Sequence, residues 1–467
     1  MIDMTKDMTR GNPGKILFLF ALPILFGNIF QQLYSMVDSI VVGNFVGSDA
    51  LAAVGGSYAI TFAITGIAFG LSNGASILIG QYFGAGRKRE VRHSIVTCVA
   101  FSVALSLVLA AVSILATPAL LRLLNTPQSL MDMSKQYIYI YFLGLVFTFT
   151  YNILSSVFRA LGDSKTPLLF LIISSITNIV LDLWFVISFG WGVAGVAIAT
   201  VISQAVSSVL ALFALRKRLA AIAAADEEKL DAEPLRRQFS PTLLKQMIKL
   251  AIPTTAQEIA ISAGMMIMQA LVNGFGPVIM AAYTAAMKIE SLAMMPMVNI
   301  STAVTGYTAQ NIGAGKVGRV KTGYRYSLLI SLGFALLMAG VVVLFGGPLC
   351  SIFVSGEGAE AVIAAGANYL LYSAASYFLM ALLFPAEGVM KGAGDVNLFM
   401  VFALSGIASK TIAALALSPI IGYTGIWIAV VIGWLAECIG TTIRYLTGRW
   451  KDKAIVRPAP SEEVAAQ

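Results

Sequence analysis

Residues 16–42, ILFLFALPILFGNIFQQLYSMVDSIVV, decide the class of fold. The stretch is long enough to cross a bilayer core of about 30 Å, which takes about 20 residues of helix. It contains one charged side chain, Asp38, and one proline, Pro23. It is longer than the apolar region of a signal peptide, and no cleavage pattern follows it. We therefore predict that it forms the first membrane-spanning helix.

The rest of the chain has the same character. Of its 467 residues, 58% are hydrophobic and 12% are charged, which is about half the charge of a soluble domain. Apolar stretches of spanning length lie at residues 15–43, 54–82, 93–117, 136–158, 166–189, 193–215, 243–272, 280–309, 324–346, 365–389, 396–418 and 424–446. We predict an all-α polytopic membrane protein with twelve transmembrane helices. Too little chain remains outside them for a catalytic domain.

Positive charge sets the expected orientation of these helices. The 31 Lys and Arg residues lie at the N-terminus, in the even-numbered connectors and in the C-terminal tail, except for Arg122, Lys135, Lys288 and Lys410. Because Lys and Arg concentrate on the cytoplasmic side of membrane proteins, we expect both termini in the cytoplasm. The net charge of +8 is then a topology signal, and it requires no nucleic-acid partner.

The second half of the chain repeats the first with a shift of about 230 residues. Ala-Leu-Pro at 21–23 returns as Ala-Ile-Pro at 251–253, and Gly-Ala-Gly at 84–86 returns at 313–315. Each half holds an even number of spans, so we expect two pseudo-symmetric six-helix lobes arranged as parallel repeats. The expected domains are an N-terminal lobe at 1–216, a cytoplasmic linker at 217–242, a C-terminal lobe at 243–447 and a disordered cytoplasmic tail at 448–467.

The sequence lacks the motifs of enzymes. Gly315-Lys316 is followed by Val317 in place of the Ser or Thr of a phosphate-binding loop. Neither a nucleophile elbow nor a paired-histidine zinc motif is present, and His93 is the single histidine. We interpret the two Gly-Ala-Gly motifs as turns that follow helices. We expect no enzyme activity, no catalytic residues, no cofactor and no bound metal other than a coupling Na⁺.

Two acids inside the predicted spans of the first half are the main functional candidates, since a charge at mid-bilayer costs at least about 2.5 kcal/mol. Gln31, Tyr34 and Asp38 share one face of span one, and Asn178 lies one turn before Asp182 on span five. If the two carboxylates meet in a poorly hydrated place, they bind either a proton or Na⁺. The alternative is that each acid only accepts structural hydrogen bonds.

Pro23 lies fifteen residues before Asp38, and it removes a backbone hydrogen bond from span one. It marks either a bend that moves or a static kink.

The second half does not copy this acid pair: Met268 and Ala413 stand at the repeated positions. Glu258 is a candidate for recognising cations, and Glu387 is four residues from Lys391, which is typical of a local ion pair. Lys410 and Glu437 lie at similar depth, so they either neutralise each other or contact the substrate.

Many methionines, including Met265, lie in spans seven and eight, where they serve either packing or a flexible cavity wall. The expected substrate cavity comprises Gln31, Tyr34, Glu258, Met265 and Lys410.

Several of these fragments, in this order and in duplicate, resemble the multidrug and toxic compound extrusion (MATE) family. The marks are Ala-Leu-Pro at 21–23, Val-Asp-Ser-Ile-Val-Val-Gly at 37–43, Gly-Gln at 80–81 before Gly-Ala-Gly at 84–86, Arg-Ala-Leu-Gly-Asp at 159–163, Asn178, Asp182, Gly-Val-Ala-Gly-Val-Ala-Ile-Ala-Thr at 192–200, and Gln-Asn-Ile-Gly-Ala-Gly at 310–315. The resemblance covers residues 12–447 and favours the prokaryotic branch.

The resemblance implies a secondary active antiporter that exports organic cations or amphipathic toxic compounds in exchange for H⁺ or Na⁺ by alternating access. It implies an ion site at Asp38, Asn178, Asp182 and Thr200, with Pro23 at the bend of span one. We place the protein in a bacterial cytoplasmic membrane and expect a monomer. Glu258 lies nearer Pro253 than the acid that one branch carries in span seven.

Two alternatives stay open. One is a flippase for a lipid-linked anionic precursor, which Lys288 and Lys410 favour and the acidic first lobe opposes. The other is a membrane receptor or channel.

Overall fold

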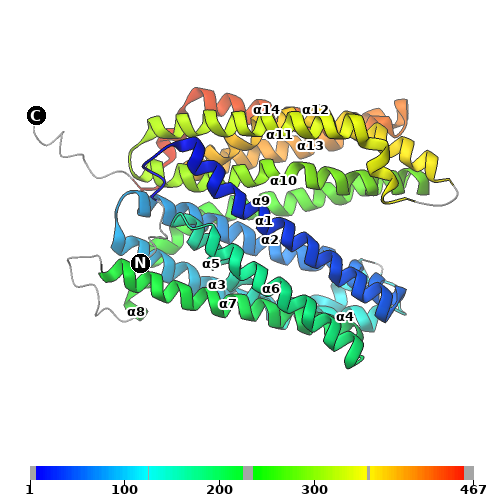
Figure 1. Cartoon of the computed structure of the whole chain (residues 1–467), viewed down its shortest axis with the longest axis horizontal. Coiled ribbons are helices and arrows are strands. Elements are labelled where there is room, and N and C mark those ends of the chain that lie inside the picture. The colour runs from blue at the N-terminus through cyan, green and yellow to red at the C-terminus, as the bar shows by residue number, and fades with distance from the viewer. Residues whose placement is uncertain (1–6, 125, 225–234, 355–357, 457–467) are drawn as a thin grey trace, which may run out of the picture. The chain divides into compact units, whose positions relative to one another are not determined.

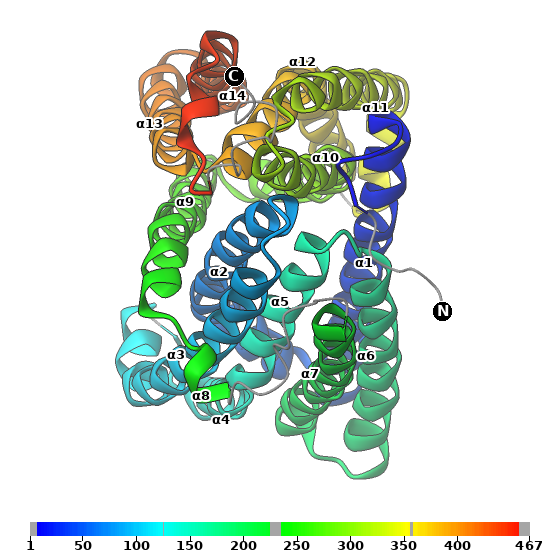
Figure 2. The same ribbon diagram turned by 90° about the vertical axis from the view of Figure 1, so that its left-hand side faces the viewer.

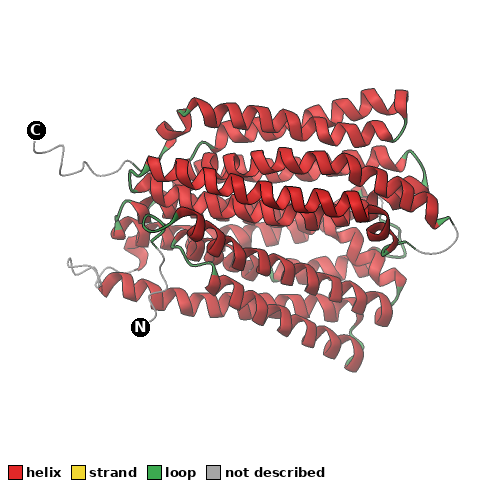
Figure 3. Ribbon diagram, turned by 45° about the horizontal axis from the view of Figure 1, so that its top comes forward, coloured by secondary structure: helices red, strands yellow, loops and turns green. Residues whose placement is uncertain are grey.

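The computed structural model describes residues 7–124, 126–224, 235–354 and 358–456. In these ranges all regular elements are helical and no strand occurs (Figure 3). The elements are α1 (Pro13–Val41), η1 (Val42–Val46), α2 (Ser48–Gly84), α3 (Lys88–Leu123), α4 (Met131–Leu143), α5 (Leu145–Ala160), α6 (Lys165–Leu183), η2 (Trp184–Ser188), α7 (Gly192–Ala224), α8 (Leu235–Gln238), α9 (Pro241–Asn273), α10 (Pro277–Gly313), α11 (Val317–Ser351), α12 (Ala359–Ala393), α13 (Val396–Ile421), α14 (Thr424–Thr447) and η4 (Arg449–Lys453) (Figure 1). The predicted all-α fold is confirmed.

The predicted number of spans is also confirmed. Among the described residues, eleven helices are long and apolar enough to cross a membrane, and α4 with α5, bent by 48°, make a twelfth. The bend falls at Gly144, where an added Cβ would lie 2.3 Å from Val201 Cγ2. Large apolar side chains point outward along the spans, among them Leu115 at 82% exposed. Such an exposed apolar surface suits contact with lipid.

The chain divides into two compact units at positions other than the expected lobe boundaries. One unit contains Pro23–Thr255 together with the residues up to Asp7, and the other contains Met8–Leu22 and the chain from Ala256 onward. Helices α1 and α9 are therefore each shared between the two units. Both divisions fall at or beside a helical proline, Pro23 or Pro253, where the missing N–H weakens the helix.

The expected linker and tail are partly regular structure. Helix α7 continues to Ala224, and α8 forms at Leu235–Gln238, both inside the predicted linker. The predicted tail begins with the short helix η4, because Trp450 is buried, stacks on Tyr445 and donates to its carbonyl oxygen at 3.0 Å. The predictions of a linker at residues 225–234 and of a disordered tail at residues 457–467 lie outside the described residues.

A short segment before α1 is held by the hairpin of α10 and α11 in the same unit. The Met8 N–H donates to Gln310 Oε1 at 3.0 Å, and its carbonyl oxygen accepts from Asn311 Nδ2 at 3.2 Å and from Arg319 Nη2 at 3.3 Å. Lys316 Nζ donates to the carbonyl oxygen of Thr9 at 3.1 Å. The second Gly-Ala-Gly motif is a turn, as predicted, and the polar residues around it bind the entry segment of α1.

The segment before α9 is held in the same way in the other unit. Ser240 N–H donates to Thr97 Oγ1 at 3.0 Å, and Arg92 Nε donates to Gln238 Oε1 at 3.1 Å. Tyr82 Oη donates to Gln246 Oε1 at 3.1 Å. Each repeat thus begins with a segment that belongs to the compact unit of the opposite repeat. Sequence periodicity does not show this exchange, because it depends on contacts between residues far apart in the chain.

Arg319→Gln is expected to release the entry segment of α1. The substitution removes a charged donor to Met8 and to Asn311, and one such hydrogen bond contributes about 1.5–3 kcal/mol. Amide hydrogen exchange at residues 8–14 should therefore accelerate at least about tenfold. Arg325→Gln, which changes an exposed arginine of the same helix, is the control. Equal exchange in both variants would show that Arg319 does not hold the segment.

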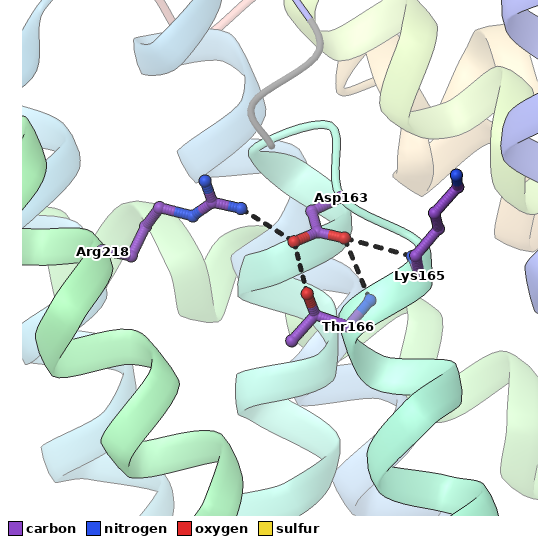
Figure 4. Close-up of polar contacts among 4 residues, drawn as sticks. All are labelled: Asp163, Lys165, Thr166 and Arg218. Carbon is purple, nitrogen blue, oxygen red and sulfur yellow. Dashed lines mark hydrogen bonds and ion pairs between the residues drawn. The ribbon is translucent and has the colours of Figure 1, made fainter. Parts of the chain in front are cut away.

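The Gly-Asp turn that precedes the fifth span joins α5, α6 and α7. The Asp163 Oδ1 atom accepts from the N–H groups of Lys165 at 3.1 Å and Thr166 at 3.0 Å, and its Oδ2 lies 2.7 Å from Arg218 Nη2 (Figure 4). Gly162 supplies the positive φ of +83° that the turn needs. The repeat forms the same contact, with Arg444 Nε 2.7 Å from Asp395 Oδ2 and Gly394 at φ +91°.

Asp163→Asn is expected to destabilise the protein by about 3 kcal/mol, because it leaves a largely buried arginine without its counter-charge. The side chains of Asp163 and Arg218 are 3% and 15% exposed. Thermal unfolding in detergent should show a lower Tm for this variant and for Asp395→Asn. The double variant Asp163→Asn with Arg218→Gln should recover part of the loss. An unchanged Tm in the single variants would contradict the role assigned to these pairs.

Candidate functional site

The predicted ion-binding residues come from α1, α6 and α7 of one unit. In the part of α1 that follows Pro23, the side chains of Tyr34 and Asp38 are half-buried and that of Gln31 is exposed. Helix α6 places Asn178 and Asp182 in the interior, at 1% and 0% exposed. The burial of Asn178 and Asp182, and the partial burial of Tyr34 and Asp38, place these four side chains toward the inside of the unit.

The two acids are near each other, which is the condition under which the sequence predicts that they bind a proton or Na⁺. The carboxyl groups of Asp38 and Asp182 are close enough for their charges to act on each other. Two ionised carboxylates have no hydrogen to share and repel each other. A proton on one of them, or a cation between them, would turn this repulsion into an attraction.

Buried polar atoms of this site have no protein partner. In the described part of the chain, Asp38 Oδ1, both side-chain polar atoms of Asn178 and both carboxylate oxygens of Asp182 lack hydrogen bonds from protein groups. Leaving one such group unsatisfied costs about 1–3 kcal/mol. Such a concentration in one place suits a proton or a small cation with oxygen ligands. These residues therefore fit a proton or a small cation.

The structure does not join Thr200 to the acid pair by a polar contact. Its hydroxyl donates to the carbonyl oxygen of Val196 at 3.0 Å, within its own helix. The role of Thr200 therefore stays a prediction.

Tyrosines of α4, which were not among the predicted site residues, border the acid pair. Tyr137 interacts electrostatically with both Asp38 and Asp182. Its ring stacks on Tyr141 with centroids 6.2 Å apart, and Tyr141 Oη lies 3.2 Å from Thr65 Oγ1. The sequence signal that could have identified them is the pair of tyrosines one helical turn apart within an apolar span.

Each acid is followed at once by a π-helical turn. η1 begins four residues after Asp38, and η2 begins two residues after Asp182. Val42 of η1 and Val186 of η2 belong to one buried cluster, so the two turns are neighbours. π-turns inside helices occur frequently at functional sites. The hydrophobic periodicity of the sequence does not predict these π-helical turns.

The charged residues of the second unit differ in how they are compensated. Glu387 and Lys391 form the predicted local ion pair. Glu258, which had no partner in the sequence pattern, is half-buried and interacts electrostatically with Lys391 and Glu387. Lys410 and Glu437 do not form a direct ion pair in the described ranges. Their opposite charges attract each other only at a distance.

The methionines of α9 and α10 separate into two groups. Met268 and Met297 are buried in the core of the second unit, and Met280, Met287 and Met294 pack against it. Met265 is 51% exposed. Core packing therefore accounts for part of this group. Among the residues that the structure describes, no group of three or more His, Cys, Asp or Glu is suited to hold a metal ion.

Comparisons with known proteins match nearly the whole chain. The MatE family model matches residues 23–184 and 253–415, so the two matches begin at Pro23 and Pro253, at or near the positions where α1 and α9 change unit. The chain is 31% identical over 447 residues, 95% of this chain and 97% of the relative, to "Probable multidrug resistance protein YpnP" of Bacillus subtilis. It is 23% identical, over 95% of this chain and 94% of the relative, to "Probable multidrug resistance protein NorM" of Thermotoga maritima.

Solved structures share the fold. A transporter of the MOP superfamily from Pyrococcus furiosus superimposes with a TM-score of 0.88 at 23% identity, covering 97% of this chain and 99% of that one. An outward-facing multidrug resistance MATE family transporter superimposes with a TM-score of 0.87, also at 23% identity, over 97% and 99% of the two chains. The helix content, the spans and the duplicated family match agree, and the chain therefore belongs to the MatE family and is a multi-pass membrane transporter, not an enzyme.

Proposed function

We propose that this transporter is a multidrug efflux antiporter that exports organic cations or amphipathic compounds in exchange for H⁺ or Na⁺. The observation that carries the proposal is the pair Asp38 and Asp182, whose buried oxygens face each other without protein donors. The relatives described above are named as multidrug resistance proteins, which supports the class of cargo.

The coupling step follows from the charge of the acid pair. Without a bound cation, the two carboxylates repel each other, and binding H⁺ or Na⁺ removes net charge from the site. Asp38 lies on the part of α1 that begins at Pro23 and belongs to the same unit as Asp182. The bound and free states of the site therefore favour different positions of this part of α1, with Pro23 as the bend. This difference supplies the two states that alternating access requires.

The surroundings of the transporter follow from charge and sequence. We place it as a monomer in a bacterial cytoplasmic membrane with both termini on the cytoplasmic side, as the distribution of Lys and Arg indicates. The lipid bilayer and small molecules are its partners, and no nucleic acid or cofactor is required. Gln31, Tyr34, Glu258, Met265 and Lys410 remain the proposed substrate-contacting residues.

Uptake into inverted membrane vesicles tests the proposal. Ethidium accumulation should require an imposed gradient of either H⁺ or Na⁺, directed out of the vesicle, and it should stop when that gradient is dissipated. Accumulation that ignores both gradients would reject the antiporter. Steady ion current under voltage without movement of a second solute would instead support a channel. The match to relatives named as multidrug resistance proteins does not favour the flippase.

A further inference from the structure

A tyrosine hydroxyl lies near the acid pair without a partner of its own. Tyr137 of α4 is half-buried and interacts electrostatically with both Asp38 and Asp182. Within the described ranges its hydroxyl takes part in no hydrogen bond. A tyrosine hydroxyl can donate one hydrogen bond, and a donor beside a carboxylate stabilises the ionised form. The direction in which the Tyr137 side chain points therefore affects the acid pair.

The ring of Tyr137 is held by apolar packing and by a second tyrosine. It packs against the buried cluster that contains Val42 of η1 and Val186 of η2. One helical turn further along α4, Tyr141 stacks on it, with the ring centroids 6.2 Å apart and the ring planes at 21°. Such a stacked aromatic pair is favourable beyond the area that it buries. The orientation of Tyr137 therefore depends on the position of Tyr141.

A hydroxyl group of α2 fixes Tyr141. Helices α2, α4 and α5 pack against one another in the first unit (Figure 2). Thr65 Oγ1 of α2 lies 3.2 Å from Tyr141 Oη. Thr65 has a single hydroxyl hydrogen, and it donates this hydrogen to the carbonyl oxygen of Thr61 at 2.8 Å. Tyr141 is therefore the donor in its hydrogen bond with Thr65.

This hydrogen bond gives the two tyrosines of α4 different tasks. The hydroxyl hydrogen of Tyr141 is bound by α2. Tyr141 interacts electrostatically with Tyr58 of α2 and Tyr34 of α1, and in the part of the chain that the structure describes it acts on neither acid. The hydroxyl of Tyr137 is the one that is left to face the acid pair.

The remaining titratable groups near the acid pair do not replace Tyr137. Tyr34 of α1 interacts with Asp38, and also with Tyr151 of α5. Helix α6 has no titratable side chain between Lys165 and Asp182, and α7 has none before Arg216. Among the described residues, no basic side chain acts on either acid. Without a cationic neighbour, the acid pair is sensitive to the placement of a single hydroxyl donor.

We propose that Thr65 is a positioning residue for the coupling ion. By accepting the hydrogen of Tyr141, it holds the ring that supports Tyr137, and it leaves Tyr137 as the donor that faces Asp38 and Asp182. The hydroxyl of Thr65 thereby sets the pH at which the acid pair gains and loses a proton. The inference rests on the proposed role of the acid pair as the ion site, and it adds a residue of α2 that acts through two tyrosines of α4.

Infrared spectroscopy of the full chain in lipid nanodiscs tests the inference without requiring transport. Protonated carboxyl groups give a C=O stretching band, and the part of this band that Asp182→Asn removes belongs to the acid pair. The intensity of this part is followed from about pH 4 to pH 10 in sodium-free buffer. Thr65→Val should raise its midpoint by at least about 0.5 pH unit, because the ionised pair loses the Tyr137 donor. Thr65→Ser keeps the hydroxyl and should restore the midpoint of the parent protein.

Thr61→Val is the matched control. It removes a hydroxyl of the same helix that donates to the carbonyl oxygens of Ser57 and Tyr58 within α2. Its midpoint should therefore stay within about 0.2 pH unit of that of the parent. The Tm of every variant is measured in the same nanodiscs. Tyr141→Phe breaks the same hydrogen bond as Thr65→Val, so it should give the same shift, and it replaces Thr65→Val should that variant unfold.

A double-mutant cycle tests whether Thr65 acts through Tyr137. Tyr137→Phe removes the donor itself and should raise the midpoint at least as much as Thr65→Val does. Adding Thr65→Val to Tyr137→Phe should then cause no further shift, because the group through which Thr65 acts is already absent.

Four results would overturn the inference. These are a parent-like midpoint in Thr65→Val, an equal shift in Thr61→Val, additive shifts in the double variant, and an acid pair that does not titrate in this range. If one of them occurs while ethidium uptake still follows the ion gradient, the proposed antiport stands. If the infrared shifts appear as expected while uptake ignores both gradients, Thr65 positions the acid pair and only the antiport is wrong.

Discussion

Vesicles that contain Asp182→Asn are expected to lose ion-driven ethidium accumulation by at least about thirtyfold, or about 2 kcal/mol of coupling. The carboxamide removes one negative charge and cannot take up a proton in this range, so the site no longer changes charge with the ion. Asp182 is 0% exposed, and its charge and that of Asp38 act on each other. Asp38→Asn should give the same loss. Initial rates under the imposed gradient measure the effect.

Asp132→Asn is the matched control for this prediction. It makes the same chemical change in the same unit, on a side chain that is 98% exposed, and it should keep at least about half of the rate. Ethidium binding in the absence of a gradient should persist in Asp182→Asn, which separates lost coupling from lost folding. Parent-like accumulation in both Asp38→Asn and Asp182→Asn would remove the basis of the proposed mechanism.

Gly70→Val is expected to prevent folding of the transporter. A Cβ at Gly70 of α2 would lie 2.0 Å from Thr255 Oγ1 and 2.6 Å from Thr255 Cα of α9. One turn later, a Cβ at Gly74 would lie 2.9 Å from the backbone nitrogen of Ala251. Thr254 Oγ1 also donates to the carbonyl oxygen of Gly70 at 3.0 Å. The added methyl groups would force the helices apart at a cost of at least about 3 kcal/mol.

Size-exclusion chromatography of the purified variant checks this prediction, and no monodisperse peak is expected. Gly55→Ala is the control in the same helix, since nothing lies within 4 Å of an added Cβ there. That variant should be as stable as the parent, or more stable by up to about 1 kcal/mol, because alanine favours the helix over glycine. A well-folded Gly70→Val protein would show that the close approach of α2 and α9 is not required.

Both predictions concern residues whose importance has different origins. Asp182 was selected from the sequence, because an acid in an apolar span is unusual whatever surrounds it. Gly70 was not selected, because glycine is common in membrane helices. Its role follows only from the backbone of Thr255, which is far away in the chain.

The amino-acid sequence by itself determined the all-α class, the twelve spans, the duplication and the selection of Asp38 and Asp182 as candidates. These features follow from local composition, from hydrophobic periodicity and from repeated fragments. Composition and periodicity depend only on residues near one another in the chain, and the repeats are found by aligning the two halves of the sequence.

Only the tertiary structure decided that α1 and α9 change compact unit at their prolines, that π-turns follow both acids, and that Thr65 of α2 bonds to Tyr141 of α4. Each of these depends on which helices approach one another and how closely. That choice is made by packing over the whole chain, and no local pattern records it.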